Sequence, residues 1–181
     1  MERLICHDFT DRMAQTNHTH GPSLDLVTRA IGRRSFCMLA TASAATRPHA
    51  AAVLYAPVDT TLYVSTLRTS RKARNIAANP QVAVTIPVRR LPVGPPSSIQ
   101  FQGRADILAA DDPHVTGLVE AGRLRAITGH GELDEPDGCI LRIAPVRRIT
   151  TYGLGMPLRR LLRDPLHAGG SVDLPGTAPA P

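Results

Sequence analysis

Apolar and polar residues alternate along several short segments of this chain, a pattern typical of β-strands. The turns between the first three segments are only a few residues long, which indicates antiparallel neighbours because parallel strands need a long crossover connection. Pro145 interrupts the last segment, so we expect a broken strand there. The predicted strands cover residues 35–43, 48–56, 61–66, 81–86, 98–108, 139–143 and 147–152.

Three segments show the helical spacing of apolar residues instead. The first begins at Ser23 and ends at Gly32, the second begins at Ser70 and stops before Pro80, and the third runs over 111–127. Serine is a favourable N-cap for the first two. The apolar faces predicted for these two helices consist of Leu24, Val27, Ala30 and Ile31, and of Ala73, Ile76 and Ala77.

Antiparallel strands with helices at their ends predict a small closed barrel, because closure removes the exposed edges of a flat sheet. Gly103 is the expected position of a β-bulge within it. Residues 1–22 are polar and irregular, and few regular signals follow the last strand. We therefore predict a flexible N-terminal arm at 1–22, a barrel domain at 23–155, and an irregular, partly disordered tail at 156–181.

The amino-acid composition indicates which side chains form the hydrophobic core. A chain of 181 residues with 43% hydrophobic residues is long enough for one globular domain with a sizeable core. Tryptophan is absent and aromatic residues make up 3%, so aliphatic side chains must fill that core. No segment has the roughly 18–20 apolar residues of a membrane span, and the start of the chain lacks a signal-peptide pattern. These features predict a cytoplasmic protein without a membrane partner.

The cysteine spacing and the net charge limit which metals, disulfides and ligands we expect. Cys6, Cys37 and Cys139 lie far apart without metal-ligand spacing, so we expect neither a metal site nor a disulfide framework. The net charge of +6 raises nucleic acid as an alternative partner. The basic residues are spread along the chain and aromatic residues for base stacking are scarce, which favours an anionic small molecule instead.

Lys72 is the only lysine of the chain, and it follows Ser70 and Arg71 at the predicted start of the second helix. Free backbone N–H groups and the helix dipole favour an anion at such a position. Ser65 and Thr66 add hydroxyls at the end of the preceding strand, so these five residues predict a site for one phosphate group. A solvated basic helix cap in an arginine-rich chain is the alternative.

The strand before this cluster carries three successive alanines, which leave its backbone accessible to a flat ring. We expect it to pair beside the strand that ends at Thr66, so that the two form a groove for a phosphate and a ring. Close packing of small side chains is the alternative explanation. The candidate ring-flanking residues are Ala50, Ala51, Ala52, Val53, Leu54 and Tyr55.

Six segments, 39–41, 47–49, 62–66, 70–76, 79–82 and 102–105, agree in order and residue type with a known family. Together they resemble the pyridoxamine 5′-phosphate oxidase-like, FMN-binding split β-barrel family. The resemblance implies a homodimer of six-stranded antiparallel split barrels with the cofactor between the subunits. It also implies that Ser65, Thr66, Arg71 and Lys72 hold the cofactor phosphate, that the backbone of residues 50–55 flanks the ring, and that Ser98 or Gln100 reaches it.

Two positions depart from the oxidase that names the family, because Ala50 and Tyr55 stand where it has an arginine and a lysine. The chain looks more like the flavin/deazaflavin branch, whose members use FMN or coenzyme F-420. The implied function is hydride transfer between that cofactor and a small organic substrate, and a non-catalytic cofactor carrier or haem-binding protein is the alternative. The catalytic residues are unknown, with His49 and Tyr55 as candidate proton donors.

Overall fold

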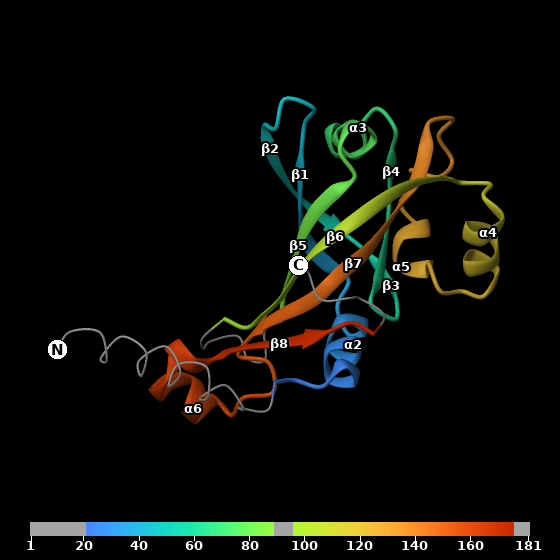
Figure 1. Ribbon diagram of the computed structural model, residues 1–181. Coiled ribbons are helices and arrows are strands. Elements are labelled where there is room, and N and C mark those ends of the chain that lie inside the picture. Colours follow the sequence, from blue (N-terminus) through green and yellow to red (C-terminus); the bar gives the residue numbers. More distant parts are fainter. Residues whose placement is uncertain (1–20, 89–95, 176–181) are drawn as a thin grey trace.

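One antiparallel sheet forms most of the protein (Figure 1). The computed structural model describes residues 21–88 and 96–175. The strands are β1 Phe36–Ala42, β2 Pro48–Leu54, β3 Ala56–Val58, β4 Thr61–Leu67, β5 Gln81–Pro87, β6 Ser98–Ala109, β7 Gly138–Tyr152 and β8 Gly169–Asp173. Across the sheet they follow the order β2-β1-β5-β6-β7-β4-β3, and β8 pairs with β7 beside this path.

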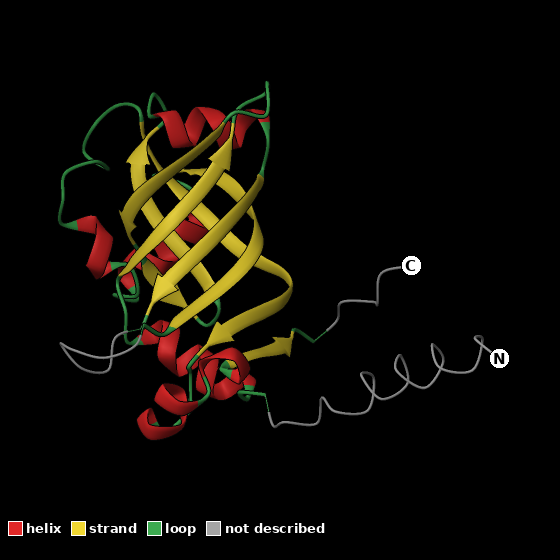
Figure 2. Ribbon diagram, turned by 90° about the vertical axis from the view of Figure 1, so that its left-hand side faces the viewer, coloured by secondary structure: helices red, strands yellow, loops and turns green. Residues whose placement is uncertain are grey.

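The chain itself closes this sheet into a barrel. β2 and β3 lie at opposite ends of the strand order, yet only Tyr55 separates them in the sequence. They are two parts of one bent strand, which joins the first and last positions of the sheet. With that strand counted once, six strands surround the core (Figure 2), and β8 is an addition. The predicted class, a mainly β antiparallel split barrel, is confirmed.

The same bend leaves the barrel split on one side. β2 pairs with β1 along its whole length, whereas β4 pairs with β3 and β7. Among the described residues no ladder joins β2 to β4, so their edges separate beyond the bend. The prediction that the alanine strand pairs directly beside the strand ending at Thr66 is therefore wrong, because only the short β3 continues to β4.

Two helices cover opposite ends of the barrel, as Figures 1 and 2 show. α2 (Leu24–Gly32) and α3 (Arg71–Ala78) are capped by Ser23 and Ser70, as predicted. Each serine side chain accepts a hydrogen bond from a backbone N–H of the first turn. The caps satisfy donors that would otherwise lack a partner, and so fix where each helix begins.

The single helix predicted for 111–127 is two helices. α4 (Pro113–Glu120) and α5 (Arg125–Thr128) are separated by a turn in which Gly122 has a φ of +67°. That left-handed conformation suits glycine and ends the first helix. Both helices lie beside the barrel (Figure 1), and they cover a small cluster made of Ala56, Tyr63, Val115, Leu124, Ile127 and Ile140.

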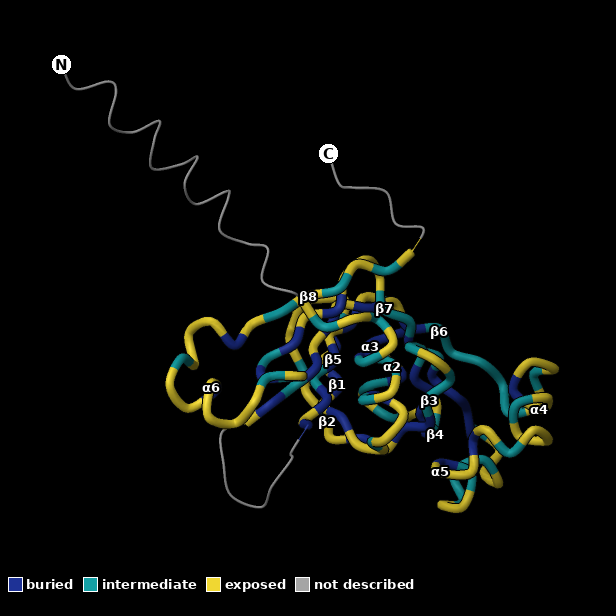
Figure 3. The backbone as a smooth tube through the Cα atoms, turned by 90° about the horizontal axis from the view of Figure 1, so that it is seen from below, coloured by how far each residue is buried: buried dark blue, intermediate teal, exposed yellow. Residues whose placement is uncertain are grey.

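Aliphatic side chains fill the barrel, as the composition predicts. The largest fully buried ones include Ile31, Leu39, Leu62, Ile86, Ile99, Leu141, Ile143 and Ile149. Buried positions follow the strands in Figure 3, whereas α4 is largely exposed. Cys37 lies in this core, and burial raises the pKa of its thiol to about 12. Cys37 is therefore a protonated, unreactive thiol at neutral pH.

The C-terminal part is more regular than predicted. β7 continues through Pro145, because that residue lies opposite Gly103, where the β6–β7 ladder shifts register at the predicted bulge. Within the predicted irregular tail, α6 (Leu158–Arg163) and a 3-10 turn (Pro165–His167) precede β8. The residues of β8 pair with β7, a non-local contact that the local sequence pattern did not reveal.

Most of the predicted N-terminal arm, residues 89–95 between two strands and the last residues of the predicted tail lie outside the described residues. In the part of the chain that the structure describes, no helix has both the length and the apolar character needed to cross a membrane.

Candidate functional site

The start of α3 holds most of the residues predicted to bind phosphate. The Ser70 Oγ accepts the Ala73 N–H at 3.3 Å and a hydrogen bond from the Thr66 hydroxyl at 3.2 Å. The Ser65 hydroxyl donates to Oε2 of Glu132 at 3.3 Å. The predicted hydroxyls therefore gather at this helix start, although Ser65 already has a carboxylate partner.

Lys72 lies on the β7 side of the same turn. Cys139, near the start of β7, pairs with Thr66 in the sheet. Burial raises the pKa of the Cys139 thiol, the positive charges of Arg68 and Lys72 act to lower it, and the negative charge of Asp137 adds to the rise. Lys72 is thus close enough to act on Cys139, and it shares these surroundings with a carboxylate.

Arg71 faces the other side of α3. It lines a cleft between this helix and the β1–β2 hairpin, with a volume of about 370 Å³. Consecutive helical residues are about 100° apart around the helix axis, so the side chains of Arg71 and Lys72 lie on different sides of α3. The lining residues are Ser43, Arg47, Pro48, His49, Arg71, Arg74 and Asn75, and we call this space the arginine cleft. The structure therefore divides the predicted phosphate cluster in two.

The β1–β2 turn fixes the position of Arg47. The Ser43 N–H donates to the Arg47 carbonyl at 3.0 Å, and the Thr46 N–H donates to the Ser43 carbonyl at 2.8 Å. The Arg47 N–H also donates to the Ser43 Oγ at 3.2 Å. Thr46 has a φ of 57°, the left-handed conformation in which three-residue hairpin loops often end. Arg47 entered the sequence analysis only as part of the segment 47–49 that carries the family resemblance, and it was missed there as a site residue.

Asn75 connects α3 to β1 at the cleft. Its side chain is 7% exposed, and its Nδ2 donates to the Thr41 Oγ1 at 2.9 Å. The Thr41 hydroxyl lies 3.4 Å from the His49 carbonyl, to which it donates. The helix was predicted to turn Ala77 inward, but Ala77 is exposed and Asn75 is buried instead. Apolar periodicity cannot identify a polar residue that is buried because it is hydrogen-bonded.

The arginine cleft carries positive charge without nearby negative partners. Its lining contains Arg47, Arg71 and Arg74 but no carboxylate. Within residues 21–88 and 96–175, none of these three arginines forms an ion pair. His49 also lines the cleft, and its Nδ1 is buried without a hydrogen-bond partner among the described residues. Such a set of unused donors favours an anionic ligand.

Tyr55 is a core residue. It is fully buried, and its hydroxyl donates to the Ile31 carbonyl at 2.9 Å. Burial raises the pKa of this hydroxyl well above its ordinary range, so it keeps its proton. Of the two candidate proton donors, only His49 lines the cleft, and the side chain of Tyr55 is excluded from a role in proton transfer.

The alanine strand alternates between two faces. Ala50 and Ala52 are exposed, Ala51 packs partly buried against the core, and Val53 is buried. Leu54 is again exposed. This alternation is the ordinary geometry of a strand, so a ring lying on the outer face would meet only every second side chain.

Ala50 and Ala52 belong to a flat outer face of the sheet, which we call the outer platform. The strand registers place Ala50 in one row with Ala40, Ala83 and Gln102, and Ala52 in the next row with Met38, Thr85 and Gln100. Three large apolar side chains are exposed on it: Phe36 (41%), Met38 (39%) and Leu54 (43%). The platform consists of Phe36, Met38, Ala40, Ala50, Ala52, Leu54, Ala83 and Thr85.

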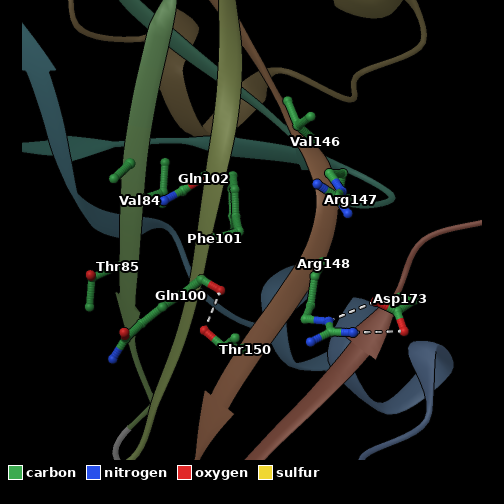
Figure 4. Close-up of a pocket in the computed structure, with 11 residues that line it drawn as sticks. Val84, Thr85, Gln100, Phe101, Gln102, Val146, Arg147, Arg148, Thr150 and Asp173 are labelled. Carbon is green, nitrogen blue, oxygen red and sulfur yellow. Dashed lines mark hydrogen bonds and ion pairs between the residues drawn. The ribbon is translucent and has the colours of Figure 1, made fainter. Parts of the chain in front are cut away.

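A depression of about 540 Å³ continues the platform towards β7 (Figure 4). Gln100 lines it, and the Gln100 amide donates to the Ser98 Oγ at 3.0 Å. Arg148 turns aside to pair with Asp173 of β8, with Nε and Oδ1 2.7 Å apart (Figure 4). The two predicted ring contacts, Ser98 and Gln100, therefore lie on the outer face, and neither lines the arginine cleft.

Among the described residues, no group of three or more His, Cys, Asp or Glu side chains lies close enough to hold a metal ion.

Fold and site together define a split-barrel protein with hydroxyls and cations gathered at the start of α3. The chain belongs to the pyridoxamine 5′-phosphate oxidase family, whose model matches residues 25–152. This match extends from α2 to the end of β7, so it includes both sides of α3. No curated protein matches the chain.

Solved structures share the fold at low sequence identity. The haem storage protein HutZ from Vibrio cholerae has a TM-score of 0.60 and 19% identity, covering 72% of this chain and 94% of its own. A haem-binding protein from Mycobacterium smegmatis has a TM-score of 0.65 and 17% identity, covering 84% of this chain and 58% of its own. An FAD-binding protein from Mesorhizobium loti has a TM-score of 0.59 and 20% identity, covering 73% and 93%.

Tyr55→Phe tests the assignment of Tyr55 to the core. The change removes one buried hydroxyl–carbonyl hydrogen bond, so we expect the free energy of unfolding in urea to fall by about 0.5–1.5 kcal/mol. Flavin affinity should stay within about twofold of the wild-type value, because the hydroxyl does not reach the cleft. Tyr152→Phe, at a half-buried tyrosine, is the control and should leave stability nearly unchanged. Lost binding at full stability would contradict the assignment.

Proposed function

We propose that the protein is an oxidoreductase that transfers a hydride between a small organic substrate and a bound FMN or coenzyme F-420. The observation that carries the proposal is the cluster of the Thr66 and Ser70 hydroxyls and Lys72 at the start of α3, with the arginine cleft on the other flank of the helix. Membership of the pyridoxamine 5′-phosphate oxidase family supports a phosphate-bearing cofactor. The FAD-binding protein of the same fold gives further support to a flavin-type ligand.

The residues around α3 fit a phosphate group. The first turn of α3 offers backbone N–H groups, and the Thr66 and Ser70 hydroxyls lie next to them. Lys72 and Arg71 supply charge from the two sides of the helix. Helix N-termini and charge-assisted hydrogen bonds are the usual means by which proteins hold phosphate.

When bound, FMN or coenzyme F-420 supplies a ring that accepts or gives up a hydride. The part of the chain is to bind, orient and shield that ring. Ala50 and Ala52 leave space on the outer face, and Gln100 lies at the other end of the row that contains Ala52. His49 is the candidate for holding a proton near the substrate, since it lines the arginine cleft.

We further propose that two copies associate through the outer platform, with the cofactor at the subunit interface. Phe36, Met38 and Leu54 form an exposed apolar surface around small residues, which is the composition of a surface that a partner covers. A cytoplasmic location is part of the same proposal, and the two described cysteines, Cys37 and Cys139, are free thiols.

The alternative is a protein that binds or carries a flavin or haem without turnover. HutZ and the Mycobacterium smegmatis protein, which share the fold, are a haem storage and a haem-binding protein.

Cofactor titration tests the phosphate site. Arg71→Ala combined with Lys72→Ala should weaken the binding of both FMN and coenzyme F-420, because each lost charge-assisted contact costs about 1.5–3 kcal/mol, or tenfold or more in Kd. Fluorescence titration gives the two dissociation constants. Arg159→Ala with Arg163→Ala, on the exposed surface of α6, removes the same charge elsewhere and serves as the control. Equal affinity in the first double variant would refute the site.

Anaerobic turnover separates the enzyme from the carrier. The cofactor-loaded protein is reduced and mixed with candidate acceptors, and reoxidation is followed by absorbance. The enzyme proposal expects reoxidation faster than that of the free reduced cofactor under the same conditions. Rates equal to the free cofactor across a broad set of acceptors would favour the carrier, and a haem absorbance band in the purified protein would favour haem binding.

Charge on the outer platform tests the dimer. Met38→Asp with Leu54→Asp places two unpaired carboxylates on the proposed interface, so the wild-type dimer should dissociate to a folded monomer. Sedimentation velocity measures the mass, and circular dichroism checks the fold. Leu166→Asp, at a residue that is 91% exposed outside the platform, should leave the dimer intact. A dimer that survives the platform variant must use another surface.

A further inference from the structure

Two separate groups of anion-binding side chains flank the first turn of α3. The Thr66 and Ser70 hydroxyls and Lys72 lie on the side of β4 and β7. The arginine cleft lies on the side of the β1–β2 hairpin. One phosphate group needs only one such group of donors, so the second requires its own explanation.

The arginine cleft has the size of a ligand subsite. Its volume of about 370 Å³ falls within the roughly 300–1,000 Å³ of small-molecule pockets, which is more than a single bound ion requires. Three arginines line it, and the guanidinium group is well suited to two-point contacts with phosphate or carboxylate oxygens. The expected occupant is therefore an extended group with anionic oxygens.

The cleft is also preformed. Its two walls, the hairpin and α3, are held together by the buried Asn75–Thr41 hydrogen bond of 2.9 Å. The hydrogen-bonded turn around Ser43 fixes Arg47 on one wall, while Arg74 stands on the other. Because these contacts fix the two walls of the cleft in the free protein, a ligand does not have to order the backbone that carries the arginines.

Other arginines of the protein are paired with carboxylates, which distinguishes them from those in the cleft. Arg29, Arg142 and Arg148 each pair with an aspartate at 2.5–2.7 Å. In the described part of the chain, Arg47 and Arg74 have no such partner. Like charges held around one cleft repel each other, and an anion between them would reverse the sign of that interaction.

We propose that the arginine cleft binds a second anionic group, so that the ligand carries a phosphate at Ser70 and Lys72 and a further phosphate or carboxylate at Arg47 and Arg74. For the identity of the ligand this inference rests on the proposed function. FAD, with its diphosphate, and coenzyme F-420, with a phosphodiester and glutamate carboxylates, have this chemistry. FMN has a single phosphate group and would leave the cleft unused.

The first experiment compares three cofactors. Fluorescence titration gives Kd values of FMN, FAD and coenzyme F-420 for the wild type and for Arg47→Gln with Arg74→Gln. At least one extended cofactor should bind the wild type more tightly than FMN and should lose about 10- to 100-fold in the variant, while FMN changes less than about threefold. Which extended cofactor shows the loss identifies the source of the second anionic group.

The control is Arg159→Gln with Arg163→Gln, which removes the same net charge from the exposed face of α6. It should leave all three dissociation constants within about twofold. Equal losses for FMN and the extended cofactors in the cleft variant would overturn the proposal, because the cleft would then hold the first phosphate. Unchanged affinity for every cofactor would overturn it as well.

A second experiment keeps the test independent of the flavin. Inorganic pyrophosphate should raise the melting temperature of the wild type above its value in sodium chloride of equal ionic strength, and the rise should largely disappear in Arg47→Gln with Arg74→Gln. The variant with both arginines changed to lysine should keep part of the rise. No effect of pyrophosphate on the wild type would refute the cleft as an anion site. Failure of all three cofactors, with the pyrophosphate effect intact, would refute the proposed function alone.

Discussion

The hydrogen bond from the buried Tyr55 hydroxyl to the Ile31 carbonyl fastens the point at which one strand changes partners. On one side of Tyr55 the strand pairs with β1, and on the other it pairs with β4. This change closes the barrel, because it joins the two ends of the sheet through the chain itself. It also opens the split, because β2 and β4 diverge from the bend onwards. The closure of the barrel and the split between β2 and β4 therefore both result from the bend at Tyr55, which this hydrogen bond holds in place.

The position of α3 follows from that split. The helix lies between the β1–β2 hairpin and the end of β4, as Figure 1 shows, so its two flanks face different walls. Successive residues along a helix point about 100° apart, which directs Arg71 and Lys72 to different flanks. On one flank Glu132 and Asp137 lie near the hydroxyls and Lys72. On the other, the lining of the arginine cleft contains no carboxylate.

Local sequence patterns correctly predicted the features that depend on neighbouring residues alone. The caps at Ser23 and Ser70 and the bulge at Gly103 follow from single residues and their immediate neighbours, and all three are present. The strands likewise lie close to the segments predicted from alternation. Their pairing is a non-local property, so the partner of the alanine strand was predicted wrongly and β8 was missed.

The candidate site was predicted only in part, for a related reason. Sequence reasoning found the start of α3, because a serine cap and adjacent cations are contiguous in the chain. It missed Arg74, which the helical spacing of three residues places beside Arg71, and Arg47, which joins them only when the hairpin packs beside the helix. It also missed Asn75, since a buried amide interrupts the apolar periodicity that locates a core face. Asn75 lies next to the buried Ile76, and this position was the one signal in the sequence that Asn75 could be buried. The periodicity argument assigns only apolar residues to buried positions, so it passed over Asn75.

In a chain with 21 lysines and arginines, the identity of a cation says little about its role. What separates one arginine from another is the charge that the fold places beside it. Arg142 and Arg148 form ion pairs with aspartates at the facing positions of the neighbouring strands. Their charge is therefore neutralised on the surface of the barrel. Arg47 of the hairpin and Arg71 and Arg74 of α3 line one cleft, and an anion among these like charges would replace repulsion by attraction. The lone lysine drew attention to α3, and the arginines on its opposite flank, whose lining holds no carboxylate, are the residues that we propose for a second anionic group.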